Sequence, residues 1–141
     1  MTMRLAGGSD IESGALVLIG DAASFRHLAG VLRRSEQTAI ELEPPRERPA
    51  IRPIGVLRFE PAERMASVRI SGDAATLRGN LESFARLADE IELLLEYNDL
   101  AVPGMHFHID VPPASIGGGL LAPDSRSLIL AGPIPDDVAL S

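Results

Sequence analysis

The segment His106-Phe107-His108-Ile109-Asp110 holds the densest group of potential metal ligands in the chain. If it forms a β-strand, successive side chains alternate between the two faces, so His106, His108 and Asp110 share one face. Two imidazoles and a carboxylate could form three corners of a zinc, iron or similar divalent-metal site. A catalytic site would also need an open coordination position and further partners. The alternatives are a strand whose polar side faces water, or a patch that binds a protein partner.

Other groups that often carry chemistry lack the context they need. The serines at positions 115, 125 and 127 lie outside the G-x-S-x-G turn of a hydrolase nucleophile. The triple glycine at 117–119 lacks the strand-to-helix setting and the lysine of a phosphate-binding loop. We therefore assign no catalytic residue from the sequence.

An internal repeat indicates the elements that would position the histidine strand. The segment Gly20-Asp21-Ala22-Ala23-Ser24-Phe25-Arg26 returns as Gly72-Asp73-Ala74-Ala75-Thr76-Leu77-Arg78, each time after an apolar run and before an amphipathic stretch. Asp21 and Asp73 are each predicted to cap a helix, because a carboxylate at this position accepts the free amides of the first turn. Since repeats override most other fold signals, we predict a duplicated β-α-β-β unit.

The predicted fold class is α+β, with two layers: a mostly antiparallel six-stranded sheet and two helices on one of its faces. The repeat units at 14–61 and 66–133 share a core within a single domain over 1–141, because a unit of about 60 residues is marginal alone. Residues before 14 show no periodicity and are expected to be irregular. The other face of the sheet would meet solvent, a partner or a second copy of the chain, which leaves a homodimer open.

Composition limits the classes of partner. The chain has a net charge of −7 and no cysteine. Nucleic acid is disfavoured, because its backbone is bound by clustered Lys and Arg, whereas a basic protein is accommodated easily. The one dense basic patch, Arg46, Arg48 and Arg52, is interpreted as solvated or as a contact for an acidic surface. No run of about 18 apolar residues and no signal-like start is present, so we expect a cytoplasmic protein without a membrane partner.

Two motifs of the second half resemble a predicted family of immunity proteins from bacterial polymorphic-toxin systems. Short members of that family carry an H-x-H-[LI]-[DE] strand and an L-A-P-x-S turn before the last strand, which the segments 106–110 and 121–125 match. The resemblance covers about residues 66 to 131, and the first half lacks both motifs. It implies a non-enzymatic protein that blocks a toxin by surface complementarity, with His106, His108, Asp110 and Ser125 at the interface.

An acidic inhibitor would suit a basic toxin, because complementary charge speeds association. Two alternatives remain open from the residues alone. One is a small metal-binding protein or metal-dependent enzyme that uses His106, His108 and Asp110. The other is a structural subunit of an assembly. No cofactor is indicated apart from the divalent metal of the first alternative.

Overall fold

The computed structural model describes residues 4–45, 50–100, 102, 105–109 and 120–132. This part contains two helices and nine strands, so the predicted α+β class is confirmed. The helices are α1 (Ala22–Arg34) and α2 (Leu81–Tyr97). The strands are β1 (Ala6–Asp10), β2 (Leu16–Ile19), β3 (Thr38–Glu41), β4 (Ile51–Pro53), β5 (Val56–Pro61), β6 (Ser67–Ser71), β7 (Ala74–Gly79), β8 (His106–Ile109) and β9 (Leu128–Ala131).

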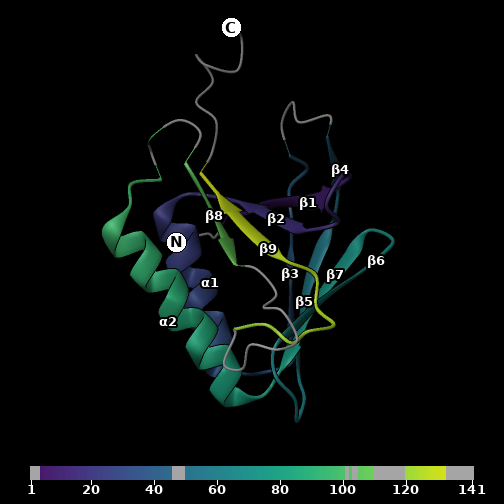
Figure 1. Ribbon diagram of the computed structural model, residues 1–141, viewed down its shortest axis with the longest axis vertical. Coiled ribbons are helices and arrows are strands. Elements are labelled where there is room, and N and C mark those ends of the chain that lie inside the picture. The colour runs from purple at the N-terminus through teal and green to yellow at the C-terminus, as the bar shows by residue number, and fades with distance from the viewer. Residues whose placement is uncertain (1–3, 46–49, 101, 103–104, 110–119, 133–141) are drawn as a thin grey trace, which may run out of the picture.

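The predicted single six-stranded sheet is wrong, because the strands form two mixed sheets (Figure 1). Sheet A has the order β4-β1-β2-β9-β8, and sheet B has the order β3-β5-β7-β6. The pairs β2–β9 and β5–β7 are parallel, and the other neighbours are antiparallel. Each parallel pair joins a strand from the first half of the chain to one from the second half. Each sheet therefore contains strands from both halves of the chain.

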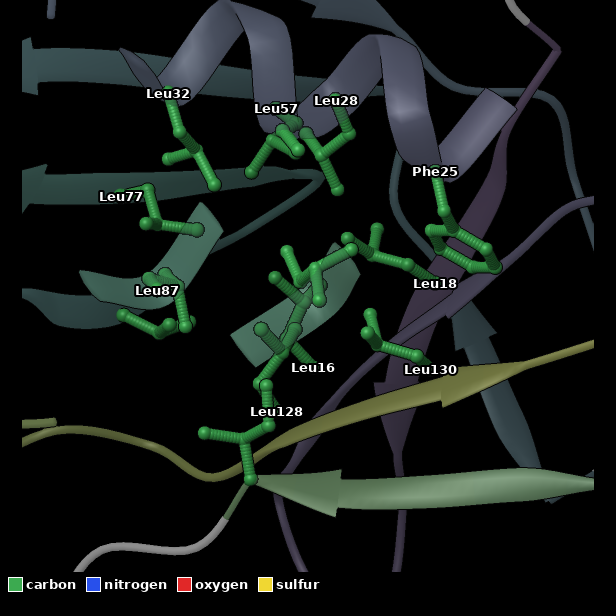
Figure 2. Close-up of a cluster of buried hydrophobic side chains, with 14 of the residues drawn as sticks. Leu16, Leu18, Phe25, Leu28, Leu32, Leu57, Leu77, Leu87, Leu128 and Leu130 are labelled. Carbon is green, nitrogen blue, oxygen red and sulfur yellow. The ribbon is translucent and has the colours of Figure 1, made fainter. Parts of the chain in front are cut away.

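The two helices pack side by side along one flank of the sheets (Figure 1). Their apolar faces and the inner faces of both sheets form one buried cluster. Figure 2 shows Leu16 and Leu130 of sheet A in this cluster with Leu57 of sheet B and Leu28 of α1. Full burial of a leucine side chain contributes about 1.5–3 kcal/mol, so this shared core holds the two sheets together. Within the described residues, no helix is long and apolar enough to cross a membrane.

The predicted helix cap at Asp21 is confirmed, whereas the one at Asp73 is wrong. The Asp21 Oδ1 accepts the N–H of Ser24 at 2.8 Å, which satisfies a free amide of the first turn of α1. In contrast, Gly72 and Asp73 form the two-residue turn between β6 and β7. Gly72 has a φ of +60°, and glycine at the first position is typical of a type II′ hairpin turn. The two similar sequences thus have different structures, and the predicted duplicated β-α-β-β unit is not observed.

The cap of α2 is Asn80, whose Oδ1 accepts the N–H of Ser83 at 2.7 Å. The segments 20–25 and 79–84 share the pattern Gly-Asx-x-x-Ser-Phe, and each leads from a strand into a helix. With β4 set aside, the elements β1, β2, α1, β3 and β5 correspond in order to β6, β7, α2, β8 and β9. Under this correspondence, sheet A without β4 has the same strand order and pairing as sheet B. The two halves share a topology, in a register other than the predicted one.

Candidate functional site

The histidine segment forms β8, which lies at one end of sheet A and pairs with β9. His106 is opposite Ala131 and His108 is opposite Ile129 in this ladder, so the four side chains lie on one face. Both histidines are exposed, and their ring centroids are 5.1 Å apart in an edge-on arrangement. His106 and His108 therefore share a face, as the alternation predicts. Asp110, the third residue of the predicted trio, lies outside the described residues.

The geometry supplies two of the three proposed metal ligands. Among the described residues, no three His, Asp or Glu side chains are grouped closely enough to hold a metal ion. Two imidazoles fall short of the three or four protein ligands that zinc usually takes. The divalent-metal site at His106, His108 and Asp110 therefore stays a prediction.

The sheet face that carries the histidines is mostly apolar, although Asp10 of β1 also lies on it, opposite Ile51. Its centre is a small buried cluster of Val17, Ile19 and Ala131, separate from the main core, with half-buried residues packed against it. We call this surface the outer face of sheet A; its side chains are those of Ala6, Asp10, Val17, Ile19, Ile51, Pro53, His106, His108, Ile129 and Ala131. The alternate residues of β2 and β9 point to the helices, as Figure 2 shows for Leu18 and Leu130. At the β8 end of the outer face of sheet A, the exposed side chains are the two histidines.

Ser125, the other predicted partner-binding residue, has a structural role in sheet B. Its Oγ accepts the N–H of Val68 at 2.7 Å and donates to the carbonyl oxygen of Arg126 at 2.8 Å. The N–H of Ala122 donates to the carbonyl of Ala66, and the N–H of Arg126 donates to that of Val68. The L-A-P-D-S turn thus pairs with the outer edge of β6. These contacts tie Ser125 to sheet B rather than to the histidine strand.

Asp124 strengthens the same connection. Its carboxylate pairs with Arg64 at 2.7 Å and with Arg69 at 3.3 Å. Desolvation raises the pKa of this carboxyl, but the positive charge and hydrogen bond of Arg64, together with Arg69, outweigh it and leave the pKa below its ordinary value of 3.8. The contacts of Asp124 and Ser125 thus give the L-A-P-D-S turn a structural role in sheet B, and partner binding by Ser125 stays a prediction.

Sequence reasoning missed a pocket of about 300 Å³ where the β1–β2 turn, β4 and the β6–β7 turn meet. We call it the turn pocket; it is lined by Ser9, Asp10, Ile11, Gly14, Arg52, Ile70, Gly72 and Arg126. Of these residues, only Arg52 belongs to the basic patch that the sequence indicates. Arg126 could not have been found, because no local pattern places the segment before β9 beside the β1–β2 turn.

Comparisons of this chain with protein-family models, with curated proteins and with solved structures found no match. The likeness to immunity proteins therefore depends on two short motifs, of which one is accounted for by the packing of sheet B. The function has to be argued from the exposed residues and their geometry.

Proposed function

We propose that this chain is a non-enzymatic binding protein that recognises a protein partner through the exposed end of the outer face of sheet A. The observation that carries the proposal is the position of His106 and His108, which stand exposed beside the half-buried Ile129 on an end strand. A partner bound there would bury the side chain of Ile129 away from water. The two imidazoles would supply donors and acceptors that fix its orientation.

The partner that fits this surface best is a basic protein, and the resemblance of the histidine motif favours a toxin. The net charge of −7 attracts a basic protein over long range, which speeds association more than it adds affinity. Coverage of a toxin surface needs no reaction on this chain. Because the attraction between exposed charges is screened by salt, affinity should weaken as ionic strength rises.

The test uses the purified product of the gene adjacent to that of this chain and measures the dissociation constant by calorimetry. His108→Ala and Ile129→Asp should each weaken binding by about tenfold or more, the usual effect of removing an important interface side chain. His27→Ala is the matched control, because His27 is also exposed but lies on α1. Its affinity should equal that of the wild type.

Absence of binding, or equal affinities for all three variants, would overturn the proposal. Metal analysis of the same proteins separates it from the metal-site alternative. Stoichiometric zinc or iron in the wild type that is lost in His108→Ala would count against a purely protein-binding strand.

A further inference from the structure

We infer that the turn pocket binds a small ligand with an oxyanion, held between the guanidinium groups of Arg52 and Arg126. This site is separate from the histidine strand and does not depend on the function proposed above. Nothing in the two immunity-like motifs assigns a role to it.

The two arginines reach the pocket from segments far apart in the chain. Arg52 of β4 is directly opposite Ser9 of β1, so both side chains lie on one face of sheet A. The backbone N–H of Arg126 donates to the carbonyl of Val68 at 3.0 Å, which fixes Arg126 beside β6. Its guanidinium then lies over Gly14, where an added Cβ would stand only 2.5 Å from a guanidinium nitrogen. Glycine at position 14 therefore leaves room for the arginine head group.

Neither of these cations is neutralised within the described residues. Some arginines of the fold have carboxylate partners, such as Arg33 with Asp89 and Arg78 with Glu60. Within the described ranges, no hydrogen bond or ion pair joins the guanidinium group of Arg52 or of Arg126 to another residue. Two guanidinium groups in one pocket repel each other, and an anion between them would remove that repulsion.

Asp10, the carboxylate that lines the pocket, forms hydrogen bonds within the β1–β2 turn. Asp10 accepts the backbone N–H of Glu12 at 3.2 Å and the hydroxyl of Ser13 at 2.8 Å. These bonds hold the β1–β2 turn in shape and draw the oxygens of Asp10 toward it. Asp10 keeps its negative charge, but two guanidinium groups against one carboxylate leave the pocket with a net positive charge.

The chemistry and size of the pocket define the ligand class. Arginine presents a planar fork of donors that matches the oxygens of a phosphate or a carboxylate. Ser9 adds a hydroxyl, while Ile70 and the 66% exposed Ile11 add apolar surface. A volume of about 300 Å³ is at the lower limit for small-molecule sites. We expect a compact metabolite with one phosphate or carboxylate group and a small apolar part.

The experiment titrates the full chain with inorganic phosphate and, in a second arm, with acetate at the same ionic strength, and follows backbone amide signals by NMR. Saturable shifts confined to the β1–β2 turn, β4 and the residues around Arg126 are expected. Preference for one anion distinguishes phosphate from carboxylate as the recognised group. Replacement of both arginines, Arg52→Gln with Arg126→Gln, should weaken binding by about tenfold or more.

The matched control is Arg58→Gln, which removes an exposed arginine of β5 outside the pocket. It should leave the dissociation constant unchanged. No saturable shift with either anion would overturn the inference, as would an equal loss of affinity in the control, because that would indicate only nonspecific charge attraction. His108→Ala should bind both anions like the wild type, so failure of the proposed partner site leaves this result interpretable.

Discussion

Replacement of Asn80 by alanine should destabilise the protein, whereas the same replacement at Asp73 should change little. The Asn80 side chain accepts the N–H of Ser83 at 2.7 Å at the start of α2, whose inner face carries Phe84 and Leu87. Loss of such a cap costs about 1 kcal/mol, within a range of about 0.5–2 kcal/mol. For a chain of this size, 1 kcal/mol corresponds to about 3 °C in Tm.

Asp73 is the matched control, because it belongs to the sequence that resembles the confirmed cap at Asp21. Its backbone carbonyl accepts the N–H of Gly55 at 2.7 Å, and alanine keeps that bond. No side-chain hydrogen bond of Asp73 is present among the described residues. Asp73→Ala should therefore stay within about 0.5 kcal/mol of the wild type. Asp21→Ala should behave like Asn80→Ala.

Urea unfolding followed by circular dichroism measures all three free energies, with calorimetry for the change in Tm. The expected order places the two cap variants together, below Asp73→Ala and the wild type. If Asp73→Ala were as costly as Asn80→Ala, the start of α2 and the β6–β7 hairpin described above would both be contradicted.

Two glycine substitutions should act in opposite directions. Gly132→Ala should cost about 1–3 kcal/mol, because its methyl group would overlap the backbone carbonyl of Leu100. Gly30→Ala should stabilise α1 by about 0.5–1 kcal/mol, because an added Cβ there meets nothing within 4 Å. Urea unfolding measures both variants, and a lower free energy of unfolding for Gly30→Ala than for the wild type would refute this expectation. Stability should also decline in acid. Desolvation raises the pKa of Asp124, but Arg64 outweighs it and lowers the pKa below the ordinary value of 3.8. The ion pair therefore contributes its full stabilisation above pH 3.8 and loses it as the pH falls through the lowered pKa. Asp124→Asn should make the dependence of Tm on pH shallower there, and an unchanged slope would show that the pair contributes nothing.

The sequence predicts correctly those helices and strands that are specified by the residues of one short segment. The apolar run of β2 and the cap and apolar stripe of α1 are of this kind, because propensity, burial and capping agree within one short segment. β1 was not predicted, since Gly7 and Gly8 have poor strand propensity. Packing of the neighbouring strand favours glycine here, because an added Cβ at Gly8 would lie 2.5 Å from the backbone carbonyl oxygen of Arg52 in β4. Only the fold reveals that such a close approach is needed.

The sheet arrangement depends on pairings between distant segments, which no local pattern specifies. The match of Gly20-Asp21 to Gly72-Asp73 indicates the wrong register. The weaker match of segment 20–25 to segment 79–84 marks equivalent positions in the topology. Asparagine is as good a cap as aspartate. The alternation of Thr76 and Arg78 with buried Ala75 and Leu77 also indicates a strand rather than a helix.

Burial separates residues that the fold requires from residues left for function. Of the two motifs that resemble those of immunity proteins, the turn around Ser125 forms hydrogen bonds to the edge of β6, which gives it a role in the fold. His106 and His108 are exposed, and the main core does not need their imidazoles. The same reasoning applies to Arg52 and Arg126, whose charged groups add nothing to the core. Replacement of these exposed polar side chains should therefore alter recognition and leave the fold intact.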